Sequence, residues 1–424
     1  MTSGNDSTFV GFGFGPIQAG LFLLEAQRSG NFKRLVLAEV VPELVEAVRA
    51  SGGVFGLNVA YSDRIESFDV GPIEIYNPND GADREQLIAA VAEATEIATA
   101  VPSVAFYQGE SEGSLHRVLH DGIARQPEKL RVIYAAENHI AAAEALKKAI
   151  LAVSSTDRLL DSTCIANTVI GKMSAVITDR DRIEREGLRS VVTGIDRAFL
   201  VESFRHILIS KIEFSTAAAF QRDIEAFEEK STLEPFEEAK LYGHNATHAL
   251  AGYLAQARGL TRLEQLRETP ECVSFLHAAF LEESGSALIT KWQGADPLFT
   301  SDRFGAYVND LIERMLNPFL GDLVERIARD PERKLGWNDR LIGVMRLALT
   351  HGLSPDRFAL GAASALYALC PEILREPART RQILTGLWHP DSIEPDSSNE
   401  IIDKIEAALP QLCDWVNGKP PATP

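Results

Sequence analysis

The sequence predicts a Rossmann-type, doubly wound α/β domain followed by a mainly α-helical domain. Short apolar runs alternate with helical patterns up to about residue 200, and a glycine-rich turn directly follows the first apolar run. Beyond that point long helical patterns dominate. Because 424 residues exceed the roughly 250–300 over which one core usually grows, we expect two domains, 1–200 and 201–424.

Strands and helices are expected to alternate in the first half. Four short apolar runs have the length of strands: Thr8–Gly11, Arg34–Ala38, Glu96–Ala100 and Arg131–Ala135. The stretches between them carry helical periodicity: Ile17–Ser29, Pro42–Ala50, Arg84–Ala94 and Ser114–Arg125. This repetition favours a parallel sheet with helices on both of its faces.

The second half is expected to contain helices and few strands. Helical patterns cover Ser215–Phe227, Pro235–Gln256, Arg262–Leu266, Pro270–Glu282 and Arg303–Ala328. The stretch Asp391–Asn399 is rich in Asp, Ser and Pro, which predicts a loop.

Composition and charge exclude several classes of partner. A formal net charge of −18 opposes association with a nucleic acid or an anionic lipid surface. No apolar run approaches the roughly 20 residues that span a bilayer, and the polar start of the chain does not resemble a signal peptide, so we expect a cytoplasmic protein without a membrane partner. The four cysteines are far apart, which argues against both disulfides and a zinc site.

The run Phe9–Gly20 resembles a dinucleotide-binding fingerprint, because it follows a strand and opens a helix. Gly13 can form the tight turn, and Gly15 lets the backbone approach a pyrophosphate at the helix N-terminus. The third glycine of the pattern is replaced by Gln18, with Gly20 close by. We expect the cofactor site to be completed by Pro16, Ile17 and Ala100.

Glu39 indicates which dinucleotide would bind. It ends the second apolar run, 24 residues after Gly15, where a carboxylate accepts hydrogen bonds from the ribose hydroxyls of NAD and repels the extra phosphate of NADP. A glycine-rich turn can be purely structural, and a glutamate after a strand is common. Their combined spacing nevertheless predicts NAD as the cofactor.

A polar stripe lies on the predicted helix Pro235–Gln256. At about 100° per residue, Lys240, Asn245 and His248 fall within an arc of about 140° and can face one cleft. Taken singly, such a lysine is usually solvated. His244 and His248 could be packed histidines or half of a metal site, although the sequence offers no third ligand nearby, so we expect no metal.

At these residues the sequence resembles the polyol-specific long-chain dehydrogenases, and their mannitol-1-phosphate 5-dehydrogenase branch in particular. The Lys-x4-Asn-x2-His pattern of the family matches Lys240, Asn245 and His248, with Glu237 as its preceding glutamate. Further matches, in the family's order, are the Glu-Asn element Ala136-Glu137-Asn138, the Arg-x2-Asn-Pro element with Arg314, Asn317 and Pro318, and the run from Arg329 to Ile342.

The resemblance implies a hydride transfer between a polyol phosphate and NAD without zinc, interconverting mannitol 1-phosphate and fructose 6-phosphate. Lys240 would be the general base, and burial would lower its pKa from about 10.4 to roughly 7–8, where a base is effective. Asn138 and Asn245 would donate to the developing alkoxide. His248 would position the substrate hydroxyl, and Glu237 would gate proton exit.

Substrate binding is expected to involve Arg314, Arg333, Lys334 and Arg340. The last three form the best local cationic patch of this acidic chain and could hold a phosphate, or they could form surface ion pairs with Asp330, Glu332 and Asp339.

One segment departs from the family. After Asn167, where the family has Val-Asp-Arg-Ile, this chain has Ile170-Gly171-Lys172-Met173. An unphosphorylated polyol or a sugar acid is therefore an alternative substrate, and a non-catalytic dinucleotide sensor or scaffold is an alternative of another class.

Overall fold

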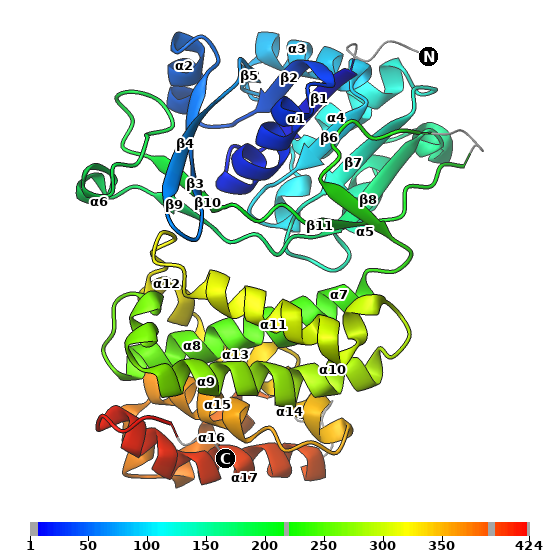
Figure 1. Cartoon of the computed structure of the whole chain (residues 1–424). Coiled ribbons are helices and arrows are strands. Elements are labelled where there is room, and N and C mark those ends of the chain that lie inside the picture. The colour runs from blue at the N-terminus through cyan, green and yellow to red at the C-terminus, as the bar shows by residue number, and fades with distance from the viewer. Residues whose placement is uncertain (1–6, 216–219, 389–394, 422–424) are drawn as a thin grey trace. The chain divides into compact units, whose positions relative to one another are not determined.

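The computed structural model describes residues 7–215, 220–388 and 395–421, coloured along the chain in Figure 1. The chain forms two compact units, residues 1–233 and 234–424. The boundary lies later than the expected 200/201, because strands β11 (Ile207–Ser210) and β12 (Phe227–Lys230) extend the sheet of the first unit.

The main sheet of the first unit has the strand order β12-β11-β8-β7-β6-β1-β2-β5. Its other strands are β1 (Ser7–Phe12), β2 (Phe32–Ala38), β5 (Glu74–Tyr76), β6 (Glu96–Thr99), β7 (Arg131–Ala135) and β8 (Thr163–Val169). All neighbours pair in parallel except β8 and β11. The strand order reverses between β1 and β6, the point at which doubly wound sheets bind their ligands.

The central strands are buried on both faces, which explains their continuous apolar sequences. In β1, Val10 pairs with Val36 of β2 on one side and with Ile97 of β6 on the other. The segments that follow these three strands therefore lie side by side: Gly13 N donates to Ala38 O at 3.0 Å, and Ala100 N donates to Phe12 O at 3.0 Å.

A second sheet has the order β4-β3-β10-β9. Its strands are β3 (Phe55–Ala60), β4 (Ile65–Val70), β9 (Ser174–Ile177) and β10 (Ala198–Glu202). They pair antiparallel except for β3 and β10. The aromatic rings of Phe55 and Phe199 both contact Phe14, with centroids 5.0 and 5.2 Å away, so this sheet packs against the glycine-rich turn.

The helices of the first unit connect these strands (Figure 1). After β1 comes η1 (Gln18–Leu23), a π-helical segment that continues as α1 (Leu24–Ser29). The others are α2 (Pro42–Ala50), α3 (Gly81–Glu93), α4 (Leu115–Arg125), α5 (Ala142–Leu151) and α6 (Arg180–Arg185), with 3-10 segments η2 (Val104–Tyr107) and η3 (Asp157–Leu160).

The described residues of the second unit form helices joined by loops, with one isolated β-bridge between Arg262 and Leu323. The first half of its sequence forms α7 (Glu234–Glu238), η4 (Ala239–Asn245), α8 (Ala246–Ala257), η5 (Leu263–Glu268), α9 (Pro270–Ala278), η6 (Ala279–Gly285), α10 (Ser286–Lys291) and η7 (Pro297–Phe299). The remainder forms α11 (Ser301–Met315), α12 (Val324–Ala328), α13 (Pro331–Lys334), α14 (Arg340–Thr350), α15 (Asp356–Leu369), η8 (Pro371–Leu374), α16 (Ala378–Leu387) and α17 (Pro395–Val416).

Helix α8 lies in the core of the second unit, and glycines let its neighbours approach closely. A Cβ atom on Gly252 would lie 2.4 Å from Ile327 of α12, and one on Gly361 of α15 would lie 2.7 Å from Leu250. Both distances are far shorter than a real Cβ contact, so a side chain at either position would push these helices apart. Close packing of α12 on α8 matters for the site described below.

Three expected elements were wrong. Of the expected helix Ser215–Phe227, residues 216–219 lie outside the described chain, 220–226 are not helical, and Phe227 begins β12. The expected helix Arg303–Ala328 ends at Met315, because Pro318 lacks an N–H and cannot continue a helix. Of the expected loop Asp391–Asn399, 391–394 lie outside the described residues and the rest opens α17, anchored by buried Ile401 and Ile405.

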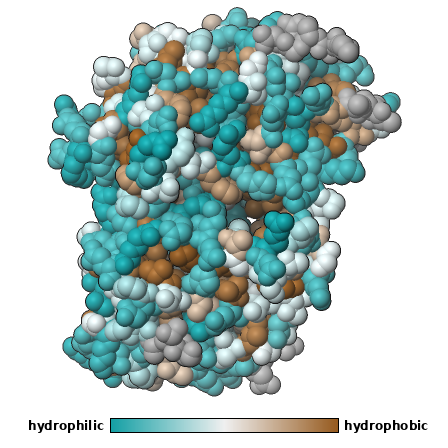
Figure 2. All heavy atoms as spheres, viewed as in Figure 1, coloured by the Kyte–Doolittle hydropathy of each residue, from teal (hydrophilic) through white to brown (hydrophobic). Residues whose placement is uncertain are grey.

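Hydrophilic residues cover most of the face drawn in Figure 2, and hydrophobic residues form separate patches among them. This agrees with a chain that carries 60 acidic and 42 basic residues. Among the helices that the structure describes, none is long and apolar enough to cross a bilayer.

Candidate functional site

A cavity of about 530 Å³ lies in the first unit at the ends of β1, β2 and β6; we call it the loop cavity. All six residues predicted to bind the cofactor line it: Gly13, Gly15, Pro16, Ile17, Glu39 and Ala100. Sequence reasoning missed other lining residues, among them Val40 and Phe106, which are 58% and 60% exposed. An apolar wall beside a carboxylate suits a ligand with a flat ring and hydroxyl groups.

The two glycines of the turn have different tasks. Gly13 has a φ of +88°, and a Cβ on it would meet the carbonyl oxygen of Ala100 at 2.7 Å. Gly15 faces open space, since no atom lies within 4 Å of its ideal Cβ position. Gly13 therefore shapes the turn, whereas Gly15 leaves room for a ligand to approach the backbone.

Gln18 changes how the first helix packs on the sheet. Its side chain is fully buried and lies over the strand, where a Cβ on Gly11 would be 2.2 Å from Gln18 Nε2. Gly20 provides close contact on another side, because its Cβ would be 2.6 Å from Val201 of β10. Close helix–sheet packing, the task of the missing third glycine, thus falls to Gly11 and Gly20.

Glu39 ties the glycine-rich turn to the end of β2. Its side chain accepts a hydrogen bond from Phe14 N at 3.0 Å and another from Val41 N at 2.9 Å, and the residue is only 8% exposed. Each carboxylate oxygen keeps a further lone pair for a donor in the loop cavity. The residue therefore holds the turn in shape and could also accept from a ribose.

Glu137 organises the wall on the other side of the loop cavity. It accepts hydrogen bonds from Thr99 Oγ1 at 2.9 Å, from Val101 N at 3.0 Å and from the hydroxyl of Tyr107. Burial raises the pKa of its carboxyl, and these hydrogen bonds oppose that effect. Asn138, the predicted second amide donor, follows at once and is exposed in the first unit.

The other predicted catalytic residues lie on one continuous helical run of the second unit, α7–η4–α8. The α-helical geometry assumed for the arc of Lys240, Asn245 and His248 was wrong, because Ala239–Asn245 is a π-helix. A π-helix carries more residues per turn than an α-helix and often occurs at functional sites. Ser284 stabilises it by donating to the carbonyl oxygen of Tyr242 at 2.8 Å.

Neighbouring helices hold this π-helical segment in place. A Cβ on Gly243 would lie 2.6 Å from the ring of Phe280, and a Cβ on Gly343 of α14 would lie 2.4 Å from the ring of Tyr242. Before it, Glu238 accepts from Lys291 Nζ at 2.6 Å and from Trp292 Nε1 at 2.8 Å. Packing and hydrogen bonds on several sides therefore fix the backbone from which Lys240 projects.

Lys240 has the electrostatic environment of a base. Burial lowers the pKa of its amine to about 8; the positive charge of Arg340 adds to this shift, and Glu237 opposes it. A sizeable neutral fraction therefore exists near neutral pH. His244, one turn further along, is a packed histidine: burial and the charges of nearby basic groups lower its pKa well below the ordinary value.

A cavity of about 130 Å³ adjoins this run; we call it the cationic cavity. It brings the predicted catalytic residues Asn245 and His248 together with the predicted substrate-binding residues Arg333, Lys334 and Arg340. Arg329, the first residue of the matched run Arg329–Ile342, also lines the cavity, and so does Arg326, which sequence reasoning missed because helix α12 gives no motif of its own. In a chain with a net charge of −18, this local gathering of cations is electrostatically suited to an anion.

The ion-pair interpretation of the cationic patch is confirmed in part, and binding of a phosphate stays a prediction. Asp339 lies 3.2 Å from Arg333 and 2.9 Å from Arg340, so ion pairs do form. Lys334 is 4% exposed and donates to the carbonyl oxygens of Ile327 and Arg329 at the end of α12; burial lowers its pKa to about 8. Lys334 therefore stabilises the wall of the cavity, whereas Arg333 and Arg340 line it while paired with Asp339.

Lys240 and Glu237 do not line the cationic cavity, and neither do two further residues that the sequence analysis singled out, Arg314 and Lys172. Arg314 does not line it, and its side chain pairs with Asp310 on α11 at 3.0 Å. Lys172, which stands where the family has arginine, belongs to the first unit and is 8% exposed. It donates to the carbonyl oxygens of Glu202 and Phe204, so it secures the chain after β10.

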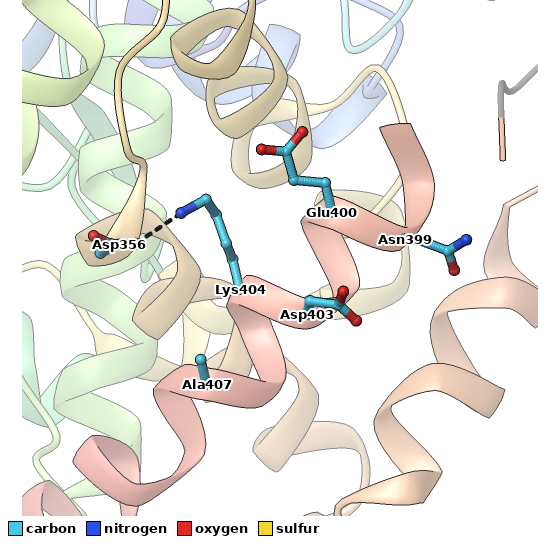
Figure 3. A pocket seen from close by; sticks show the side chains of 6 residues that line it. All are labelled: Asp356, Asn399, Glu400, Asp403, Lys404 and Ala407. Atoms are coloured by element: carbon cyan, nitrogen blue, oxygen red, sulfur yellow. Dashed lines mark hydrogen bonds and ion pairs between the residues drawn. The ribbon is translucent and has the colours of Figure 1, made fainter. Parts of the chain in front are cut away.

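A pocket of about 520 Å³ between α15 and α17 has the opposite charge (Figure 3). It is lined by Asp356, Asn399, Glu400, Asp403, Lys404 and Ala407, and Lys404 Nζ lies 3.2 Å from Asp356. Three carboxylates facing one lysine disfavour an anionic ligand here. Among the described residues, no group of three or more His, Cys, Asp and Glu side chains has an arrangement that could hold a metal ion.

Comparisons with known proteins connect this architecture to a family. The family model of the mannitol dehydrogenase C-terminal domain matches residues 232–369. A curated relative, mannitol-1-phosphate 5-dehydrogenase of Bacillus licheniformis, is 30% identical over 367 residues, which cover 85% of this chain and 88% of the relative.

Two solved structures share the fold. A substrate-free D-sorbitol dehydrogenase has a TM-score of 0.74 at 15% identity, covering 97% of this chain and 94% of that one. The Pseudomonas fluorescens mannitol 2-dehydrogenase, solved as a ternary complex with NAD and D-mannitol, has a TM-score of 0.68 at 16% identity, covering 97% and 93%. These likenesses confirm the predicted fold class, a doubly wound α/β unit followed by a helical one.

Proposed function

Because this chain belongs to the polyol-specific long-chain dehydrogenase family, we propose that it is an NAD-dependent oxidoreductase that interconverts mannitol 1-phosphate and fructose 6-phosphate. The observation that carries the phosphate is the cationic cavity, which places guanidinium groups beside Asn245 and His248. A sugar phosphate seated there would have its anionic end on the arginines and its hydroxyl end near the polar stripe. The 30% identical relative named for this substrate gives independent support.

The loop cavity fits NAD. Gly15 leaves the approach to the helix N-terminus open, and Glu39 offers acceptors to ribose hydroxyls while disfavouring a 2′-phosphate. The cofactor supplies the hydride acceptor of the oxidation. The solved relative named with NAD has the same fold, which adds to this assignment.

Proton transfer falls to residues of the second unit. In the oxidation, the neutral amine of Lys240 accepts the proton of the substrate hydroxyl, and no zinc is needed to activate it. Asn245 donates its amide N–H to the developing alkoxide, and His248 orients the hydroxyl. Glu237 lies close enough to influence the Lys240 charge and relays the proton outward. The role of Asn138 as a second amide donor stays a prediction.

The rate should depend on pH through Lys240. In the oxidation direction, kcat/KM is expected to rise with pH and level off above about 8, because only the neutral amine accepts a proton. In the reduction direction it should fall above about 8, because only the ammonium donates one. Initial rates between about pH 6 and 10 measure both profiles. If the pH profiles of the two directions do not mirror each other, Lys240 is not the group that acts as base in the oxidation and as acid in the reduction.

Replacing Glu39 by alanine is expected to weaken NAD binding and to relax discrimination against NADP. Hydrogen bonds to a charged group contribute about 1.5–3 kcal/mol, which corresponds to an increase of about ten- to hundredfold in the KM for NAD. Glu39→Gln keeps the size of the side chain and separates loss of charge from loosening of the Phe14 backbone contact. A wild type that uses NADP as well as NAD would show that Glu39 is misassigned.

Oxidation of NADH with fructose 6-phosphate, beside fructose and several keto sugar acids, tests the proposed function. Turnover with the phosphate alone is the expected result. Activity only with fructose or a keto acid would change the assigned substrate and leave the assignment of Lys240 as the base unchanged. Binding of NADH without turnover of any of them would favour a sensor or scaffold.

A further inference from the structure

Asp322 is a buried acid that contacts two residues of the cationic cavity, and it takes no part in the proposed proton transfer. Its side chain is 7% exposed. It does not line the cavity, but its two neighbours His248 and Arg326 do. The carboxylate thus contacts two groups that face the anion site from different elements, α8 and α12.

The contact with His248 is direct. His248 Nε2 and Asp322 Oδ2 lie 3.3 Å apart, within ion-pair distance, and neither of these two buried atoms has a hydrogen-bond partner among the described residues. The other oxygen of Asp322 accepts from Arg326 Nη2. Each carboxylate oxygen of Asp322 therefore contacts one of the two side chains that line the cavity.

The backbone around Asp322 is held firmly. Leu263 N donates to the carbonyl oxygen of Asp322 at 3.0 Å, and Val324 N donates to the carbonyl oxygen of Thr261 at 3.0 Å. Close packing of Ile327 on Gly252 fixes α12 against α8 a few residues further along. These contacts fix the backbone from which the Asp322 side chain projects, and the ion pair with Arg326 holds the carboxylate itself.

The carboxylate also stays charged. Burial alone would raise the pKa of Asp322, but the contacts with His248 and Arg326 outweigh burial and lower it to about 2. At any pH at which the protein works, Asp322 is therefore an acceptor and never a donor.

We propose that Asp322 is a positioning residue that fixes the ring orientation and the tautomer of His248. An acceptor at Nε2 stabilises the tautomer with the proton on that nitrogen, which leaves Nδ1 as an acceptor for the substrate hydroxyl. Arg326 holds the second oxygen and keeps the carboxylate aimed at the imidazole. This inference rests on the proposed function, in which His248 orients that hydroxyl.

Asp322→Asn is expected to lower kcat by about tenfold to hundredfold, because a misplaced orienting group costs about that much. The loss should be the same with every sugar that is turned over, phosphorylated or not, because His248 acts on the hydroxyl. In a His248→Ala background, the same substitution should cost about twofold or less, since the oriented group is gone. Equal losses in both backgrounds would assign Asp322 a purely structural role.

Glu283→Gln is the matched control, because Glu283 is also a buried acid that pairs with an arginine, Arg357 at 3.2 Å. It should lower the midpoint of thermal unfolding without coupling to His248→Ala. If Asp322→Asn fails to fold, Asp322→Glu takes its place in the double-mutant cycle with His248→Ala. The Asp322→Glu variant keeps the negative charge but displaces the carboxylate.

A readout without substrate separates this inference from the proposed function. The ring ¹⁵N shifts of His248, assigned by comparison with His248→Gln, should indicate a protonated Nε2 in the wild type and should change in Asp322→Asn. Unchanged shifts would overturn the role of Asp322 even in an active enzyme. A wild type that is inactive on fructose 6-phosphate but shows the shift change would overturn the proposed function alone.

Discussion

Lys240→Ala should lower turnover by about 10²–10⁴-fold, the usual contribution of a positioned acid or base. The amine that burial and Arg340 bring to a pKa of about 8 is lost, and nothing of similar basicity replaces it. Affinity for NADH should change little, because the loop cavity belongs to the first unit. Steady-state rates with fructose 6-phosphate and a fluorescence titration with NADH measure the two quantities.

Lys404→Ala provides the control for this variant. Lys404 also lies on a helix of the second unit and contacts an acid, Asp356, but it faces the acidic pocket (Figure 3). Its loss should leave turnover unchanged. Small primary amines in the buffer should partly restore activity to Lys240→Ala, because they can occupy the space that the side chain leaves. Full activity of Lys240→Ala would remove the lysine from the mechanism.

Arg340→Ala should raise the KM for fructose 6-phosphate by about ten- to hundredfold, because a charge-assisted bond contributes about 1.5–3 kcal/mol. Arg340 lines the cationic cavity and is oriented by Asp339 at 2.9 Å. It also lowers the pKa of Lys240, so its removal should move the pH profile of the oxidation to higher pH. Arg340→Lys should keep the pH profile and lose part of the phosphate affinity.

The substrate pair tests the assignment of Arg340 to the phosphate. Its loss should not raise the KM for unphosphorylated fructose, if fructose is turned over at all. Arg381→Ala, which breaks an exposed contact with Asp403 at 2.6 Å on α17, should change neither constant. An equal loss of affinity for fructose and fructose 6-phosphate would show that Arg340 does not recognise the phosphate.

Local sequence was enough to predict the nucleotide-binding half of the site. Gly13, Gly15 and Glu39 lie within three or four residues of a strand end, and the carboxyl ends of neighbouring parallel strands meet at one edge of a sheet. Short-range patterns therefore determine both the element and its place. The stripe with Lys240, Asn245 and His248 was found for a similar reason, because it lies on one helical run.

Long-range contacts explain what was missed. In the second sheet, β3 pairs with β10 across more than a hundred residues of sequence, and no local pattern predicts that pairing. Asp322 reaches His248, and Arg326 lines the same cavity, because Gly252 lets α12 pack closely on α8. The π-helical stretch was missed because helical periodicity assumes 3.6 residues per turn.

Because Ala239–Asn245 is π-helical, the number of residues in this segment determines where the Lys240 side chain points. Ala239–Asn245 stands between two α-helical segments, so removing one residue would give a regular α-helix and relieve an unfavourable geometry. The same deletion would rotate Lys240 by about 100° relative to His248 and aim the amine elsewhere. A shortened chain could therefore keep a helix here and yet lose its chemistry, so this stretch cannot vary in length as a surface loop can.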